Sequence, residues 1–333
     1  MPASANHERV FQIAAASLLV LVIAGALFEQ IGERQDRRRY AQIGKSYDMG
    51  GRTLNIFCSG DGGPAVVFDT FGHTAGYSWS PIQMEVAKFR RACWYDRAGY
   101  GWSDPAPMPR TFQSVAADLH ALLRAASVPP PYVLVGGGDA ASHIRVYHGM
   151  YPGEVAGIVM VNANGTDDDS VAIPEEVKGP WAKHFASFAP RVRGTACLAF
   201  PLIAKVGLVR FASLFQKPRA TPNSGMPPDE QAELDFLSDN PTAARGSEMC
   251  ARETSMEEVR SAGNLGDVPL MVLASAERFA GTSADGVAWS RYQENRVQPG
   301  LAKLSTRGRL IFIEGEMGPD KIVQAIREVA ASQ

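Results

Sequence analysis

The chain has 333 residues with a formal net charge of −2, and 45% of its residues are hydrophobic. This length and apolar content allow a large hydrophobic core in one or two domains. The nearly balanced charge gives no reason to expect a nucleic acid among its partners.

The first predicted element is an uncharged apolar segment of 19 residues, Val10–Phe28. Its length fits a transmembrane helix. The alternative is a cleaved signal peptide, because Ala24-Gly25-Ala26 matches an A-x-A cleavage site. The apolar run is long for a signal, and the segment before it offers as positive charges only Arg9 and the N-terminal amine. The sequence therefore favours a retained single-pass anchor within residues 1–40, followed by a folded domain over residues 41–333.

Two signals disagree about the side of the membrane on which this domain lies. Arg34 and the run Arg37–Arg39 follow the apolar segment, and the positive-inside rule would place them in the cytoplasm. The chain also has four cysteines, and an even number fits two disulfides in an oxidising compartment. Four buried thiols explain the same count equally well.

Downstream, short apolar runs bounded by turn residues predict strands, and segments with apolar residues at helical spacing lie between most of them. This alternation predicts an α/β fold with a mostly parallel sheet. The strands are expected at Thr53–Cys58, Ala65–Asp69, Ala92–Asp96, Tyr132–Val135, Gly157–Asn162, Pro269–Ala274 and Arg309–Glu314, and helices at Phe112–Ala126, Ala140–Met150 and Asp320–Ala331.

One long interval, residues 170–262, breaks the alternation. It is rich in aromatic residues but has no clear strand, so we expect a helical insertion that lies over the sheet. A stretch with prolines and glycines, Lys217–Pro228, divides it.

The stretch Tyr132–Pro152 has the outline of a nucleophile elbow, in which a strand, a sharp turn and a helix lift a catalytic residue above the sheet. The usual residues are Gly-x-Ser-x-Gly. Here the turn reads Gly136-Gly137-Gly138-Asp139-Ala140. A non-glycine residue on such a strained turn costs about 1–3 kcal/mol, whereas glycine adopts the conformation almost freely.

Four stretches carry a family resemblance: "VVFDTFGHTAGYSWSPIQ", "RACWYDRAGYGWSDP", "DLHALLRAASVPPPYVLVG" and "YPGEVAGIVMVNA". From about Gly44 to its end, the chain resembles membrane-anchored bacterial proteins of the α/β-hydrolase fold. The resemblance implies a mostly parallel eight-stranded sheet flanked by helices, with residues at about 170–262 as a cap. It implies hydrolysis of esters, amides or related bonds by a Ser, His and acid triad. It makes Asp96, Arg97, Gly99 and Gly101 a structural turn beneath the site.

The resemblance also places Thr53–Cys58 beside Ala92–Asp96 and antiparallel to it. Cysteines paired on such strands are close enough for a disulfide. Cys58 and Cys93 could therefore form one bridge, and Cys197 and Cys250 a second.

When the expected triad positions are compared with this sequence one at a time, the serine and the histidine of the family are missing. The nucleophilic serine falls on Gly138, which has no side chain. The catalytic histidine would follow the last strand, in Glu314–Val323, but no histidine occurs after His184. Asp167, Asp168, Asp169 and Glu277 are candidate acids without a histidine to orient. The oxyanion loop carries a bulky Phe71 beside Gly72.

Three polar side chains remain near the predicted site. Asp139 could act as a carboxylate nucleophile if the elbow shifts by one residue, but an acid that stabilises the start of the following helix is the simpler interpretation. His143 lies four residues on and shares a helix face with Asp139; a packed histidine is the alternative to a base. His73 could contact a ligand from the former oxyanion loop, together with Phe71, Gly72 and Asp139.

The sequence predicts no cofactor and no metal. "GGGDAA" also matches the dinucleotide fingerprint Gly-x-Gly-x-x-Ala. However, the next strand ends in Asn162 rather than an acid, and several strands precede the loop.

These observations favour a membrane-anchored, catalytically degenerate α/β hydrolase that binds a small apolar ligand or a protein partner. The first alternative is an enzyme with a non-standard site, Asp139 with His143 or His73, acting as a hydrolase, lyase or isomerase. The second is a structural partner in a membrane complex. The resemblance favours an exported domain, against the arginines after the anchor.

Overall fold

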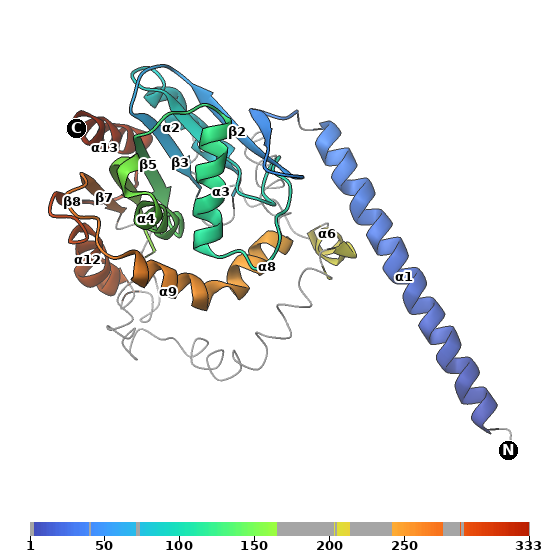
Figure 1. Cartoon of the computed structure of the whole chain (residues 1–333). Helices are drawn as coiled ribbons and strands as arrows, with labels where there is room; N and C mark the ends of the chain where they lie inside the picture. Colours follow the sequence, from blue (N-terminus) through green and yellow to red (C-terminus); the bar gives the residue numbers. More distant parts are fainter. Residues whose placement is uncertain are drawn as a thin grey trace.

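The computed structural model describes residues 3–39, 41–70, 74–164, 203, 205–213, 242–275, 287 and 290–332. Within them, one sheet of eight strands forms the centre of the molecule, in the order β1-β2-β4-β3-β5-β6-β7-β8 (Figure 1). The β1–β2 and β2–β4 pairs are antiparallel, and the other neighbours are parallel. The strands are β1 (Lys45–Asp48), β2 (Thr53–Ser59), β3 (Ala65–Asp69), β4 (Ala92–Tyr95), β5 (Tyr132–Gly137), β6 (Val155–Val161), β7 (Leu270–Ser275) and β8 (Gly308–Ile313).

The predicted strands are all confirmed, with ends shifted by up to two residues. The sequence prediction missed β1, a four-residue strand whose side chains are exposed or half-buried. Strands β3, β5 and β7 are buried at every residue. Because both faces of these parallel strands are covered, their sequences are continuous apolar runs rather than alternating ones.

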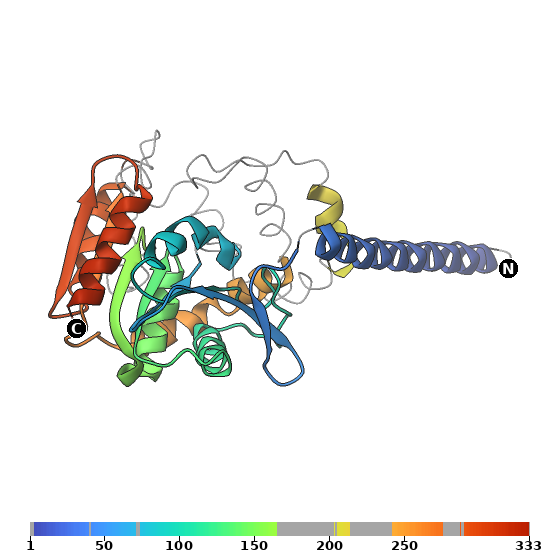
Figure 2. The same ribbon diagram turned by 90° about the horizontal axis from the view of Figure 1, so that it is seen from above.

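Helices cover both faces of the sheet, and each face has its own apolar core. On one face, α3 (Phe112–Ala125) and α4 (Ala140–Met150) pack against each other. On the other face, α2 (Ser80–Val86) packs against α13 (Pro319–Ala331). Figure 2 shows α2 and α3 on opposite sides of the strands. The three predicted helices are confirmed, and α2 is an addition.

Only part of the predicted cap insertion, residues 170–262, belongs to the described part of the chain. It contains α6 (Leu208–Ser213), α8 (Thr242–Cys250) and α9 (Arg252–Ala262). Helix α9 packs against α3 and α4, so the end of this interval is joined to the core of the domain. Short helices in the described part of the domain are η1 (Gly76–Trp79), η2 (Pro152–Glu154), η3 (Gln293–Val297) and α12 (Gln298–Ala302).

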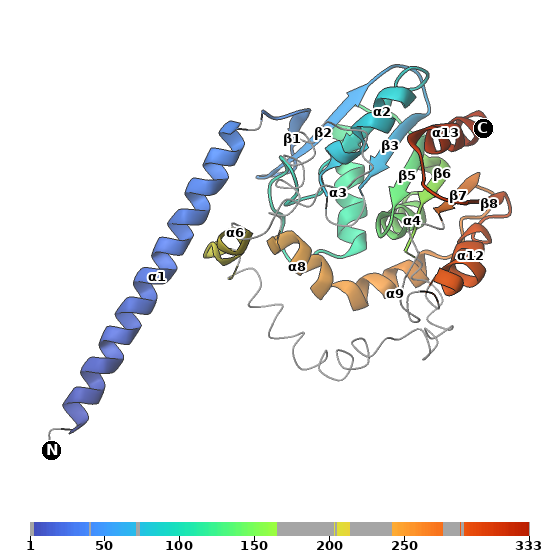
Figure 3. The ribbon, with the colours of Figure 1, turned by 180° about the vertical axis from the view of Figure 1, so that it is seen from behind.

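The N-terminal segment is one long helix, α1 (Ala3–Arg39), which projects away from the domain (Figure 1). Its stretch Arg9–Gln35 is long and apolar enough to cross a membrane, although a signal sequence meets the same criteria. Helix α6 lies beside α1 in both side views (Figures 1 and 3).

A disulfide links Cys58 of β2 to Cys93 of β4, with a Cα–Cα distance of 4.1 Å. The two residues are direct partners in the antiparallel register. The arrangement implied by the resemblance is therefore confirmed for this pair. Cys250 is also disulfide-bonded, whereas Cys197 lies outside the described residues.

Candidate functional site

The junction between β5 and α4 is the predicted strand–turn–helix. Gly138 connects the two elements with a φ of +58°, the left-handed conformation that a side chain disfavours. Its N–H donates to the Val161 carbonyl over 3.1 Å, and its own carbonyl accepts from the N–H groups of Ala141 and Asn164. The turn thus has the backbone of a nucleophile elbow, and the residue at its apex has no side chain.

Asp139 lies at the start of α4, as predicted, but its side chain makes no capping hydrogen bond. Its Oδ1 instead accepts from Asn164 Nδ2 over 3.1 Å. Asp139 therefore connects the elbow to the segment after β6, and it is not the partner of His143 in the hydrogen bonds of the described residues. Stabilisation of the start of α4 by the charge of this carboxylate, the predicted structural role, stays a prediction.

His143 is paired with Asp69, a residue that the sequence analysis did not select. His143 Nδ1 lies 2.9 Å from Asp69 Oδ2, and the two residues are 4% and 1% exposed. Asp69 is the last residue of β3 and is in register with Gly136 of β5, so the pair lies directly beside the elbow. The Phe112 ring meets the imidazole edge-on at 4.6 Å.

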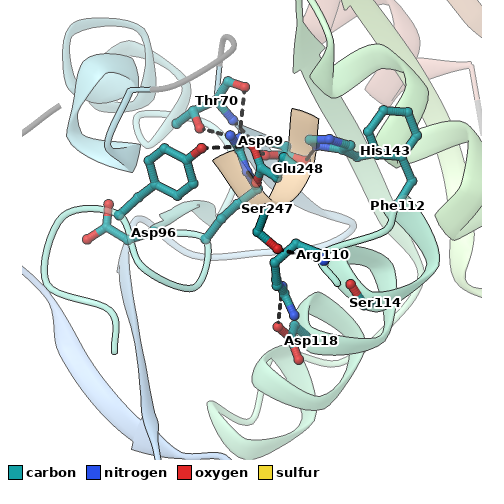
Figure 4. A network of polar contacts seen from close by, with 12 residues as sticks. Asp69, Thr70, Asp96, Arg110, Phe112, Ser114, Asp118, His143, Ser247 and Glu248 are labelled. Carbon is teal, nitrogen blue, oxygen red and sulfur yellow. Dashed lines mark hydrogen bonds and ion pairs between the residues drawn. The ribbon is translucent and has the colours of Figure 1, made fainter. Parts of the chain in front are cut away.

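Arg97 extends this pair into a buried network of polar side chains, of which Figure 4 labels Asp69, Thr70, His143 and Glu248. Its guanidinium lies 3.2 Å from Asp69 Oδ1 and 3.2 Å from Glu248 Oε1. It also donates to Thr70 Oγ1 over 2.8 Å. Tyr100 donates to the other carboxylate oxygen of Glu248 over 2.8 Å. Glu248 belongs to α8. This network of polar contacts therefore joins the sheet to a helix of the interval predicted as a cap.

The electrostatics of Asp69 reflect its partners. Burial by itself raises the pKa of this carboxyl, but the attraction and hydrogen bonds of His143 and Arg97 outweigh burial, so its pKa is lowered. The nearby Tyr95 phenol is buried and faces the negative charge of Asp69, and its pKa is raised well above the usual range. Asp69 is therefore held as a carboxylate at neutral pH.

Asp96 forms a second buried carboxyl site at the end of β4. It accepts hydrogen bonds from the Gly76 N–H at 2.6 Å, Asn55 Nδ2 at 3.0 Å and the Trp102 N–H at 3.1 Å. Burial raises its pKa to about 6, although these three hydrogen bonds lower it. Gly99 and Gly101 have positive φ in the following turn, which is consistent with the structural role implied for this segment.

Several predicted site residues lie outside the described part of the chain. These are Phe71, Gly72, His73, the acids Asp167, Asp168 and Asp169, and Glu277. The segment after β8 is described and contains Glu314, Glu316 and Met317, with no histidine. Two clefts found in the described part lie elsewhere, one between β7, β8 and α13 and one beside β1 and β2.

The described carboxyl ends of the strands present polar side chains. Asn162 directly follows β6, has a φ of +46°, and its Oδ1 accepts from the Ser275 N–H over 2.8 Å. Two residues later in the chain, Asn164 donates from Nδ2 to Asp139 Oδ1 over 3.1 Å. No group of three or more potential metal ligands occurs among the described residues. Asp139, Asn162 and Asn164 are therefore polar side chains close to the elbow, each with a hydrogen-bond partner within the protein.

Comparison with known proteins identifies the fold. No model of a known protein family matches the chain. The chain superposes on a thermophilic esterase of Thermogutta terrifontis (TM-score 0.59, 19% identity, 88% of this chain and 99% of that one). It also superposes on an esterase of Exiguobacterium antarcticum (TM-score 0.55, 14% identity, 87% and 99%) and on an epoxide hydrolase of Vigna radiata (0.55, 14%, 87% and 98%).

Two curated relatives match shorter parts of the chain. A Bacillus subtilis protein, "Uncharacterized protein YqjL", is 29% identical over 139 residues, 41% of this chain and 55% of that protein. An "uncharacterized vacuolar membrane protein" of Saccharomyces cerevisiae is 36% identical over 88 residues, 25% of this chain and 14% of that protein. The matches thus span about half or less of these relatives. Together with the sheet order, the structural neighbours show that the chain has the α/β-hydrolase fold.

Proposed function

We propose that this α/β-hydrolase-fold chain is a membrane-anchored binding protein that has lost the hydrolytic triad. The observation that carries the proposal is Gly138. It occupies the apex of a fully formed elbow with a φ of +58°, where a serine would have to stand to attack a carbonyl.

The absence of the catalytic histidine supports the same conclusion. A serine at the elbow needs a histidine to take its proton, and the family places this histidine after the last strand. The whole chain has no histidine beyond His184. Loss of one triad member already costs on the order of 10⁶ in rate in a serine protease, so two losses leave no triad chemistry.

The partner we propose is a small molecule with an apolar body, held at the carboxyl edge of the sheet. Asp139, Asn162 and Asn164 provide hydrogen-bonding groups there, and a ligand site needs a few such groups to fix orientation. The anchor we propose is α1, whose length and composition fit a membrane span. A protein partner at this edge is the alternative occupant.

The test is labelling with a fluorophosphonate probe, combined with turnover of short acyl esters by the full chain in detergent. We expect neither labelling nor turnover above the rate without protein. The variant Gly138→Ser should behave in the same way, because no histidine is placed to activate the new hydroxyl.

Gly153→Ser, at a glycine with open space around it, is the matched control for introducing a serine. Stoichiometric labelling of any serine in the unaltered chain would refute the loss of catalysis. Labelling of Gly138→Ser but not of Gly153→Ser would show that an activating base survives near the elbow.

A second candidate function rests on the Asp69–His143 pair. A carboxylate that holds Nδ1 of an imidazole at 2.9 Å orients the ring so that Nε2 can act as a base. This pair replaces the predicted combination of Asp139 with His143 in the non-standard enzyme alternative. It suits a proton-transfer step, as in a lyase or an isomerase.

Accessibility of the imidazole separates the two candidates. A binding protein with a structural pair should leave His143 unmodified by diethyl pyrocarbonate, because the residue is 4% exposed. His120, whose side chain is 22% exposed and paired with Glu154, is the matched control and should react. Rapid modification of His143 in the folded chain would favour the proton-transfer function.

A further inference from the structure

Helix α6 and the residues just before it contact α1 far from the elbow. An ideal Cβ on Gly25 of α1 would lie 2.2 Å from the Val206 carbonyl oxygen, and one on Gly207 would lie 2.6 Å from the Gly25 carbonyl oxygen. Gly207 has a φ of +69°. Two glycines therefore allow the two backbones to approach closely, which is how helices pack within a membrane.

The contacts on α1 form one stripe. Gly25, Phe28, Glu29 and Gly32 all lie against Val206, Gly207 or Arg210, and their spacing of three and four residues places them on one helix face. Gly32 leaves room for the Arg210 guanidinium, since a Cβ there would lie 2.4 Å from its Nε. The stripe is thus shaped to receive α6.

An ion pair closes this contact. Arg210 Nε lies 3.2 Å from Glu29 Oε2, and the side chains are 7% and 13% exposed. Glu29 directly follows the apolar run Val10–Phe28. A carboxylate at this depth is costly unless it is paired, so Arg210 holds α6 at the end of the apolar run.

The other side of α6 is apolar and exposed. Leu208 and Phe211 are 54% and 55% exposed, and Ile203, just before the helix, is 39% exposed. Leu208 and Phe211 are three residues apart and share a face, whereas Arg210 is buried at 6%. On α1, Leu27 and Ile31 flank the contact stripe and are each 52% exposed. Apolar surface therefore continues from α1 onto α6.

We infer that α6 is a second membrane contact, which lies in the headgroup layer with Ile203, Leu208 and Phe211 turned toward lipid. This inference rests on the proposed anchoring by α1. Apolar side chains on a short helix enter the interface when the opposite side is polar or held by protein. A bilayer is the occupant we propose because the exposed surface is continuous with that of the membrane span.

This contact brings part of the interval predicted as a cap to the bilayer surface. The ligand class that it favours is an amphiphile delivered from the lipid phase, in line with the small molecule with an apolar body proposed above. The contact itself can be tested without knowing the ligand.

The experiment uses the full chain in vesicles of phosphatidylcholine and phosphatidylglycerol, with a nitroxide on one introduced cysteine at a time. The sites are Val22 of α1, Phe211 of α6 and Met84 of α2, which is 57% exposed and serves as the matched control. Collision with oxygen reports lipid, and collision with a water-soluble nickel chelate reports water. We expect the Phe211 site to resemble Val22 and to differ from Met84.

The outcomes separate the two proposals. If the Val22 label is in lipid and the Phe211 label is in water, α6 is not a membrane contact although the anchor stands. If both labels are in water, the anchor fails and the inference fails with it. Low collision with both reagents at Phe211 would indicate a protein partner and also overturn the inference.

A second variant tests the docking contact. Gly25→Leu in the Phe211-labelled chain places a side chain against the Val206 backbone, so the label should lose oxygen contact and gain nickel contact. Ala24→Leu, at an exposed neighbouring position, should leave the label unchanged. An unchanged label in Gly25→Leu would show that docking on α1 does not position α6.

Discussion

Two buried carboxyl groups at neighbouring strand ends, Asp69 and Asp96, have pKa values shifted in opposite directions. Burial opposes the charged form of both. Asp69 has Arg97 and His143 as direct partners, and its pKa is lowered. Asp96 has mainly uncharged donors, and its pKa rises to about 6. The direction of the pKa shift therefore depends on whether the carboxyl has charged direct partners, as Asp69 has in Arg97 and His143.

The raised pKa of Asp96 predicts a pH dependence of stability. The folded state holds a proton on Asp96 up to about pH 6, whereas the unfolded chain releases it near its ordinary pKa of about 4. The free energy of unfolding should therefore fall by about 3 kcal/mol as the pH rises from about 4 to about 6, at about 1.4 kcal/mol for each unit of pKa shift. Denaturant unfolding of the full chain in detergent measures it.

The variant Asp96→Asn has no carboxyl group at this position, so its free energy of unfolding should not fall with the ionisation of this group. The difference between the free energies of unfolding of the unaltered chain and of Asp96→Asn should therefore shrink as the pH rises from about 4 to about 6. Asp61→Asn, at an exposed aspartate outside this buried site, should leave the slope unchanged. Parallel pH profiles for Asp96→Asn and the unaltered chain would contradict the prediction.

At this scale the sequence predicts some residues and not others. Gly138 and the Asp96 turn were predictable because local motifs mark them. The Asp69–His143 pair was not, because its members are 74 positions apart and only the packing of α4 on β3 brings them together. Its one sequence signal is an aspartate that ends an otherwise apolar strand.

At the scale of elements, apolar periodicity predicted the long strands and helices. It failed for β1 and α2, which have four and seven residues. Short elements carry too few residues for a clear period, and β1 is held by its pairing with β2. Tertiary contacts, rather than local preference, determine such elements.

Helix α8 should depend on its buried link to the sheet. Glu248→Ala removes the acceptor of Arg97 and of Tyr100, and a lost buried partner costs about 1–3 kcal/mol. We expect the amide hydrogens of α8 to exchange about tenfold to hundredfold faster, since each tenfold corresponds to about 1.4 kcal/mol. Mass-spectrometric exchange on the full chain measures this.

Glu257→Ala on α9 is the matched control, because Glu257 is exposed. Its exchange pattern should match that of the unaltered chain. Equal protection of α8 in both variants would show that the Arg97–Glu248 link does not hold the helix.

At the scale of the whole molecule, periodicity predicted a mostly parallel sheet, but strand order came from the family resemblance. Nothing in a single sequence fixes that β4 lies between β2 and β3. The contact between α6 and α1 could not be predicted from the sequence either, because it joins residues far apart in the chain. Arg210 and Glu29, for example, are 181 positions apart.

The Cys58–Cys93 bridge offers a test of which side of the membrane the domain occupies. In an oxidising compartment, alkylation of intact cells without reductant should leave both cysteines unmodified, and the bridge should add about 2–4 kcal/mol of stability. Mass mapping of the two peptides before and after reduction is the measurement. Full alkylation of both thiols without reductant would instead place the domain in the cytoplasm, as the arginines after the apolar segment suggest.

Gly138 at the elbow also has a consequence for how catalysis could evolve again in this protein. Under the proposed function, a serine regained at position 138 brings no selective advantage while no histidine follows β8, and a histidine regained there brings none while Gly138 remains. The serine would in addition have to adopt a φ of +58°, at a cost of about 1–3 kcal/mol. Each reversion alone is neutral or harmful, so a lineage that has lost both residues has no stepwise route back to hydrolysis.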